Sequence, residues 1–93
     1  MTAGKYYVYI LSNKYNNVLY IGVTSNLQKR MGEHAAGIKS GFAKRYNCDK
    51  LVYIETFTEV VKAIAREKEL KRFTRDRKNN LIAIKNPLWE NLL

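Results

Sequence analysis

One carboxylate stands on an otherwise apolar helical face in the second half of the chain. At about 100° per residue, a helix over residues 59–73 puts Glu67 inside the apolar arc and Glu69 on the opposite face. A carboxylate buried without a partner costs on the order of several kcal/mol, so Glu67 must be paired, hydrated or bound to a cation. An ion pair with Lys71 at i+4, or an exposed helix edge, would satisfy it without any function. The apolar side chains of the arc are Val60, Ala63, Ile64 and Leu70.

A guanidinium and an imidazole occur one helical turn apart nearer the N-terminus. Arg30 and His34 are spaced i, i+4, so they share one face of a helix expected over residues 26–36. Presented together, these two groups suit contact with a phosphate and transfer of a proton. Two solvated side chains are the plainer interpretation of the same spacing.

Two tyrosines on adjacent predicted strands complete the set of candidates. Residues 6–11 and 18–23 are β-branched and aromatic runs separated by a turn-prone stretch, a pattern typical of a β-hairpin. Tyr9 and Tyr20 could point to one side of that hairpin. Strand tyrosines are usually core residues with satisfied hydroxyls, so neither indicates an active site by itself.

The remaining pattern predicts the elements that would position these side chains. Residues 51–57 alternate with a period of two and indicate a third strand, and Asn86-Pro87 ends a last helix that starts at Thr74. Thr24 or Ser25 is expected to cap the first helix and Thr58 the second, and residues 38–49 are expected to form a surface loop or short helix. The order is β-β-α-(loop)-β-α-α. It predicts one α+β (mixed α/β) domain over residues 1–93, a small three-stranded antiparallel sheet with flanking helices.

Positive charge is the strongest compositional signal in this chain of 93 residues. It has 17 Lys and Arg against eight Asp and Glu, a formal net charge of +9. The excess lies in residues 24–50 and 62–78, whereas residues 1–22 contain only Lys5 and Lys14. Such a surface favours polyanions, above all nucleic acid, although solvated lysines and arginines explain part of it equally well.

Cysteine and histidine content excludes several classes of site. Cys48 is the only cysteine and His34 the only histidine, which excludes an internal disulfide and a cysteine-cluster zinc site and disfavours classical zinc ligation, so a metal would need oxygen ligands. No apolar run approaches the roughly 18 residues that cross a bilayer, and residues 1–5 lack the layout of a secretory signal. We therefore expect a cytoplasmic protein without membrane association.

Taken together, these residues resemble the GIY-YIG nuclease superfamily, specifically its short stand-alone single-domain members (UPF0213-like endonucleases). Tyr7-Val8-Tyr9 resembles the first motif and Tyr20-Ile21-Gly22 the second, with ten residues between the two tyrosines. An arginine and histidine helix and then a glutamate follow in the family's order, so the resemblance covers nearly the whole chain. Tyr7 and Val8 replace the Gly and Ile of the first motif, and we interpret them as structural substitutions.

The resemblance implies a catalytic set and a metal. Glu67 would hold one divalent ion, Mg²⁺ or Mn²⁺, and Arg30 would neutralise charge developing on the phosphate. Tyr9, Tyr20 and His34 would orient water and move protons, and which of the three takes the proton stays open. Asn86 is the candidate for the asparagine that the family usually supplies after the glutamate helix. The side chains expected to contact substrate are Lys29, Lys44, Arg45, Arg66, Lys71, Arg72, Arg75 and Asn86.

The resemblance also implies the GIY-YIG fold and a metal-dependent endonuclease that hydrolyses DNA phosphodiester bonds in repair or recombination. We expect selectivity for DNA structure or weak selectivity for sequence, with DNA preferred to RNA as partner. An unidentified protein partner could supply specificity, and the oligomeric state stays open. Two other interpretations remain, an inactive nucleic-acid-binding module of the same fold and a protein-interaction domain whose charge serves solubility. Weak DNA binding with steep salt dependence would mark the second.

Overall fold

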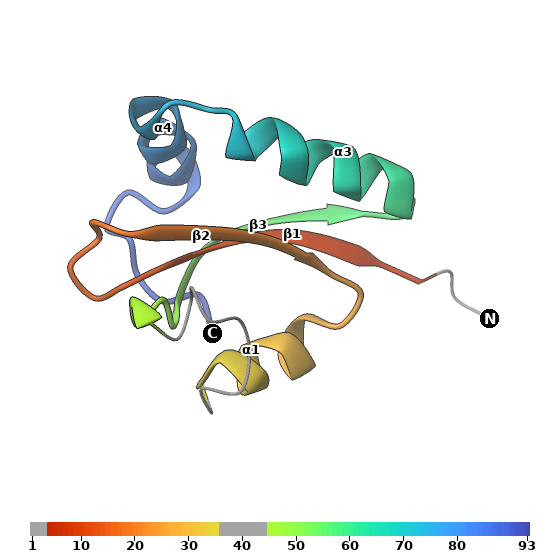
Figure 1. Ribbon diagram of the computed structural model, residues 1–93, viewed down its shortest axis with the longest axis horizontal. Coiled ribbons are helices and arrows are strands. Elements are labelled where there is room, and N and C mark those ends of the chain that lie inside the picture. The colour runs from red at the N-terminus through yellow and green to blue at the C-terminus, as the bar shows by residue number, and fades with distance from the viewer. Residues whose placement is uncertain (1–3, 36–44) are drawn as a thin grey trace.

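The computed structural model describes residues 4–35 and 45–93, apart from the side chains of His34 and Ala35. In that part of the chain three strands form one sheet and three helices flank it, the architecture that the sequence predicts (Figure 1). The elements are β1 (Tyr6–Ser12), β2 (Leu19–Thr24), α1 (Leu27–Ala35), β3 (Lys50–Phe57), α3 (Val60–Lys71) and α4 (Arg75–Lys85). None of these helices is long and apolar enough to cross a membrane.

The first strand lies in the centre of the sheet. The strand order is β2-β1-β3, and both pairs are antiparallel. Between β1 and β3 the register shifts at Ile10, which pairs with Tyr53, whereas the next residue pairs with Leu51. Val52 is therefore an extra residue in β3. The irregularity lets the consecutive side chains of Val52 and Tyr53 join the same core cluster.

Each face of the sheet has its own core. Figure 1 shows α3 and α4 over one face and α1 over the opposite face. Alternation along β1 sends Val8 and Ile10 to the first face and Tyr9 to the second. The buried cluster under α3 and α4 comprises Val8, Ile10, Ile21, Val52, Tyr53, Ala63, Leu70 and Ile82. The buried cluster on the α1 face comprises Tyr9, Leu11, Met31, Cys48 and Leu51.

The helix ends follow local hydrogen-bonding rules, but two of the predicted caps are wrong. Asn26, and neither Thr24 nor Ser25, caps α1, because its side-chain oxygen accepts from the backbone N–H three residues on at 3.1 Å. Glu59, and not Thr58, is the N-cap residue of α3, and its side chain makes no cap hydrogen bond. Thr74 caps α4 as predicted, accepting from the backbone N–H three residues on at 3.2 Å.

Candidate active site

Tyr9 and Gly22 face each other across the two strands of the hairpin. They are direct partners in the β1–β2 register, and the tyrosine ring lies over the glycine backbone. A Cβ atom at position 22 would lie 2.6 Å from Cζ of Tyr9 and 3.1 Å from its Cε1, closer than carbon atoms pack. Position 22 therefore requires glycine, since a side chain there would displace the ring.

The Tyr9 phenol lies among other polar groups although its residue is fully buried. Its ring centroid is 6.3 Å from that of Tyr20, with 36° between the ring planes. Burial and Tyr20 raise the pKa of this phenol, Arg30 lowers it through its charge and a hydrogen bond, and the charge of Glu67 raises it. The balance raises the pKa of Tyr9 to about 12, so the phenol is protonated at neutral pH.

Arg30 and Glu67 approach the tyrosines from helices on opposite faces of the sheet. The Arg30 side chain is 30% exposed and its Nε lies 3.4 Å from Oε1 of Glu33. The Glu67 side chain is 17% exposed, and Nζ of Lys71 lies 3.5 Å from its Oε2. The ion pair considered from the sequence is thus present, but it is long for a charge-assisted contact and its lysine is mostly exposed. Such a pair leaves the carboxylate able to bind another cation.

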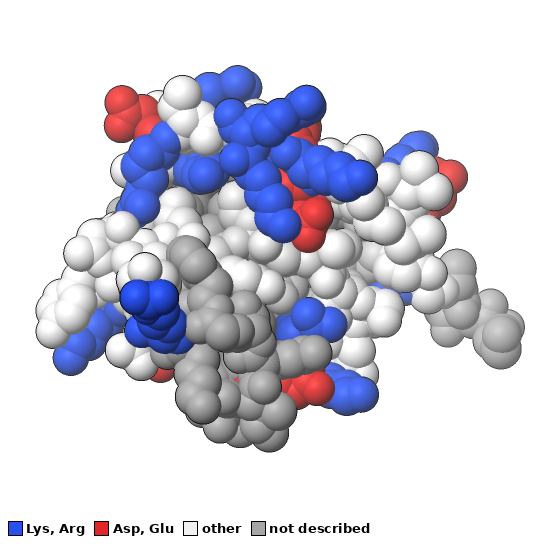
Figure 2. Space-filling view, in the orientation of Figure 1, with Lys and Arg blue, Asp and Glu red and all other residues white. Residues whose placement is uncertain are grey.

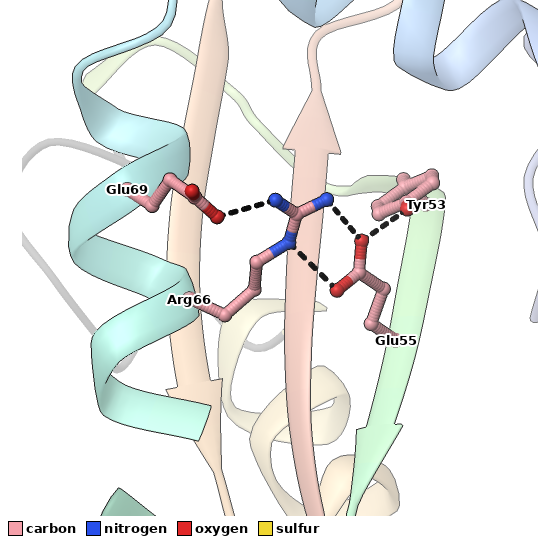
Figure 3. A network of polar contacts seen from close by, with 4 residues as sticks. All are labelled: Tyr53, Glu55, Arg66 and Glu69. Atoms are coloured by element: carbon pink, nitrogen blue, oxygen red, sulfur yellow. Dashed lines mark hydrogen bonds and ion pairs between the residues drawn. The ribbon is translucent and has the colours of Figure 1, made fainter. Parts of the chain in front are cut away.

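Arg66 fastens α3 to the edge strand β3. Its guanidinium donates from Nε and Nη2 to the two carboxylate oxygens of Glu55, each at 2.9 Å, and from Nη1 to Glu69 (Figure 3). The Tyr53 hydroxyl donates to the same Glu55 carboxylate. Burial opposes ionisation of Glu55, but the hydrogen bonds from Arg66 and Tyr53 outweigh it and lower the pKa of this carboxyl. A charged, bidentate contact therefore joins helix and strand.

This contact sets the direction in which Glu67 points. Ala63 and Leu70 are the residues of α3 buried against the sheet. Ala63 and Leu70 mark the direction in which α3 faces the sheet. Around the helix axis, residue 66 lies about 50° to one side of this direction and residue 67 about 50° to the other. Because Arg66 is held on the β3 side, Glu67 lies on the β2 side, where its charge acts on Tyr9.

The apolar stripe of α3 is narrower than the sequence predicts. Val60 is 42% exposed and Ile64 is 38% exposed, whereas Ala63 and Leu70 are fully buried. Glu67 therefore lies at the margin of the stripe and not inside it. This half-buried position avoids the cost of a fully buried carboxylate.

Three shallow depressions follow the edge strand β2. One, near the start of the strand, is lined by Tyr20, Lys71 and Lys78. The second lies at the end of the strand and is lined by Arg30 and by residues at the start of α3. The third lies beside α1 and is lined by Lys29. We call the surface formed by these five residues the β2 groove. Figure 2 shows lysines and arginines gathered over α3 and α4.

The predicted catalytic residues Tyr9, Tyr20, Arg30 and Glu67 come together at this edge of the sheet. His34 lies in α1, but its side chain is outside the described part of the chain, as is Lys44. Of the side chains expected to contact substrate, Lys29 and Lys71 line the β2 groove. Arg72, the C-cap residue of α3, is exposed, and the Arg45 guanidinium lies 5.6 Å from the Tyr46 ring centroid.

Three of the side chains expected to contact substrate make hydrogen bonds within the fold. Arg66 pairs with β3 as described above. Arg75 donates from Nη2 to the carbonyl of Asn16 at 2.7 Å and from Nη1 to that of Asn17 at 3.1 Å. Asn86 is buried, and its amide donates to the carbonyls of residues 52 and 90 at 3.1 and 2.8 Å. These contacts assign structural roles to all three.

Two residues of this region have no specific role in the interpretation of the sequence. Lys78 is one of the basic side chains of residues 62–78 that suggest contact with phosphates, but the break between α3 and α4 hides its position beside Tyr20 and Lys71. Gly22 was recognised only as part of a motif. The signal for its role is the cross-strand register with Tyr9, which requires the hairpin pairing to be known.

The donor chemistry at Glu67 fits one hard divalent cation. Among the residues that the structure describes, no three Asp, Glu, His or Cys side chains gather where they could hold a metal ion. Mg²⁺ is commonly bound by one or two carboxylates, keeps several waters and takes further oxygen ligands from substrate phosphates. A single half-buried carboxylate beside a groove suits that mode of binding.

Comparisons with known proteins bear on the family and the fold. The family model described as the GIY-YIG catalytic domain matches residues 5–80. The UPF0213 protein of Staphylococcus haemolyticus is 40% identical over 78 residues, which are 84% of this chain and 94% of that protein. The UPF0213 protein of Clostridium perfringens is 40% identical over 85 residues, 91% of this chain and 90% of that protein. The solution NMR structure of the UPF0213 protein from Bacillus halodurans, 30% identical, superposes with a TM-score of 0.60 over 94% of this chain and 92% of that one.

Proposed function

The chain belongs to the GIY-YIG family, and from this premise we propose that it is a metal-dependent endonuclease that hydrolyses DNA phosphodiester bonds. The family match supports a nuclease-like function and a nucleic acid substrate in general terms. The observation that carries the finer proposal is the meeting of Tyr9, Tyr20, Arg30 and Glu67 at the edge of β2. The net charge of +9 fits a polyanionic substrate.

The substrate backbone would lie along the β2 groove. Lys71 and Lys78 at one end and Lys29 at the other would contact phosphates on either side of the scissile bond. Arg30, between them, would neutralise charge that develops on the reacting phosphate. Such contacts read backbone shape and not base sequence, so we propose selectivity for a DNA structure, as in repair or recombination.

Tyr9 would orient water or phosphate and would not itself accept the proton. Burial is the largest of the influences that raise its pKa to about 12, so at neutral pH the phenol is a hydrogen-bond donor. Proton acceptance then falls to Tyr20 or to His34. The histidine is one helical turn beyond Arg30 and belongs to the residue type that titrates near neutral pH.

Glu67 would hold one Mg²⁺ or Mn²⁺. Nucleases of this family generally depend on a divalent metal ion. When bound, such an ion supplies charge stabilisation at the phosphate and the leaving oxygen. The contact between Arg66 and Glu55 would support this role, because it keeps Glu67 turned towards the β2 groove.

The proposal is tested by cleavage of labelled duplex, nicked, flapped, branched and single-stranded oligonucleotides in Mg²⁺ or Mn²⁺. We expect the wild-type protein to cut at least one of these substrates only when metal is present. Glu67→Ala should abolish cutting and retain binding, whereas Arg30→Ala should weaken both. Binding by the wild type without cutting across the whole panel would instead support an inactive nucleic-acid-binding module.

A further inference from the structure

A hollow with a volume of about 280 Å³ lies at the tip of the β1–β2 hairpin, outside the β2 groove. It approaches the lower end of the size range of small-ligand pockets, about 300 Å³, which suits one small planar group. Its lining residues are Asn13, Lys14, Tyr15, Tyr46, Asn47 and Asp49. None of these residues belongs to the catalytic set.

Two aromatic rings in this hollow are each accompanied by a cation. Tyr15 is 71% exposed, and Nζ of Lys14 lies 5.0 Å from its ring centroid. Tyr46 is 40% exposed, and the Arg45 guanidinium lies 5.6 Å from its ring centroid. Exposed rings interleaved with basic side chains are the arrangement that binds single-stranded nucleic acid, because bases stack on the rings and phosphates meet the cations.

The hairpin side of the hollow is preformed. The side-chain oxygen of Asn13 accepts from the backbone N–H of Asn17 at 3.0 Å and from that of the next residue at 3.2 Å. Arg75 of α4 donates to the carbonyl of Asn17, which fastens the loop to that helix. On the other side, Asn47 has a left-handed backbone (φ 55°), and its carbonyl accepts from the N–H of Asp49 at 3.0 Å. A site ordered in advance loses less entropy when a ligand binds.

The hollow is close to the β2 groove in the sequence, and α4 contacts both regions. Tyr15 precedes Tyr20 by five residues, so at about 3.4 Å per residue the two lie at most about 17 Å apart. Arg75 contacts the hairpin loop, and Lys78, one turn further along α4, lines the groove beside Tyr20. A span of about 17 Å corresponds to about five stacked nucleotides at roughly 3.4 Å each.

We propose that the hollow binds one unpaired base of the substrate, within about five nucleotides of the scissile phosphate. The inference rests on the proposed function and sharpens its substrate class to DNA with a single-stranded stretch beside a duplex. Tyr15 and Tyr46 stack against the base, and Lys14 and Arg45 contact the flanking phosphates. The Asp49 carboxylate accepts from an exocyclic amine of the base.

Binding in EDTA tests the site without requiring cleavage. Fluorescence anisotropy compares a blunt duplex with the same duplex carrying a five-nucleotide single-stranded arm on either strand. Tyr15→Ala should weaken binding of the armed duplex by about fivefold to 150-fold, the range for loss of one stacked base, and leave the blunt duplex unchanged. Tyr15→Phe keeps the ring and should keep the affinity. Ile84→Ala, which shortens a side chain that is 79% exposed on α4, is the matched control.

Equal weakening for both duplexes, or unchanged binding of the armed duplex, would overturn the inference. Tyr46→Ala, checked for folding by thermal denaturation, repeats the test from the other side of the hollow. A 2-aminopurine base in the arm adds a direct readout, because stacking quenches its fluorescence, and the quenching should be lost in Tyr15→Ala. Wild type that binds the armed duplex but cuts nothing would refute the proposed nuclease alone. Cutting that is insensitive to both tyrosine variants would refute the base site alone.

Discussion

Replacing Gly22 by alanine should damage both the fold and the activity, because the new methyl group enters the space of the Tyr9 ring. The added Cβ would lie 2.6 Å from Cζ of that ring, and an ordinary carbon contact of about 3.5 Å requires a shift of about 1 Å. Tyr9 is fully buried, so the ring has no open space to move into. Overpacking of this kind costs about 1–3 kcal/mol.

The matched control is Gly32→Ala. Gly32 lies in α1, and a Cβ there would meet nothing within 4 Å. Alanine in a helix is favoured over glycine by about 0.5–1 kcal/mol, so this variant should be slightly more stable than wild type and equally active. The two variants add the same methyl group, one beside the tyrosine ring and one in open space.

Thermal denaturation followed by circular dichroism measures the difference. For a domain of this size each kcal/mol shifts Tm by about 4–8 °C, so Gly22→Ala should lower Tm by about 4 to 24 °C and Gly32→Ala should raise it slightly. A 1 Å displacement of the Tyr9 phenol should also reduce the cleavage rate by about a hundredfold. Gly22→Ala with the Tm and cleavage rate of wild type would refute the cross-strand contact as the reason for this glycine.

Three further predictions concern pH and salt. The fold lowers the pKa of the Glu55 carboxyl below 4.5. The ionised carboxylate therefore stabilises the folded protein at neutral pH, and this contribution is lost as pH falls through the pKa in the folded state. The Tm values of wild type and Glu55→Gln should differ at pH 7 and converge under acid. Burial is the main reason that the pKa of Tyr9 is raised from 10.0 to about 12. Wild type should therefore lose stability relative to Tyr9→Phe between about pH 10 and 12. If the denaturant midpoints of the two proteins differ by the same amount at pH 9 and at pH 11, the prediction is contradicted. Lys78→Ala should reduce the slope of log affinity for DNA against log salt by about one, whereas Lys62→Ala, which removes an exposed lysine paired with Glu59, should leave it unchanged.

The order of elements could be predicted because its signals are local. Alternating side chains at residues 51–57 indicated the strand observed as Lys50–Phe57, and the proline after Asn86 marked the end of α4 at Lys85. The predicted caps of α1 lie one or two residues too early, and that of α3 one residue too early. Several adjacent polar residues can cap a helix, and only the backbone geometry decides which side chain reaches the N–H groups.

The site could be predicted only as a set of residue types. Arg66 is one of several basic side chains of α3, and its role depends on Glu55, which lies eleven residues earlier on strand β3. Asn86 was expected at the substrate because of its residue type and position, but its amide binds the carbonyl of Val52 inside the fold. Such contacts join residues far apart in the sequence, and helical or strand periodicity carries no information about them.

The most direct test of the proposed site compares two glutamates of the same helix. Glu67→Gln and Glu69→Gln each remove one carboxylate from α3. The Glu67 carboxylate lies beside the β2 groove. The Glu69 carboxylate lies on the exposed side of the helix, where it contacts Arg66. Single-turnover cleavage of the best substrate in Mn²⁺ should slow by at least about a hundredfold in Glu67→Gln, with affinity for DNA retained, and should change little in Glu69→Gln. Equal rates in wild type and Glu67→Gln would contradict the assignment of the metal and of the catalytic edge to this carboxylate.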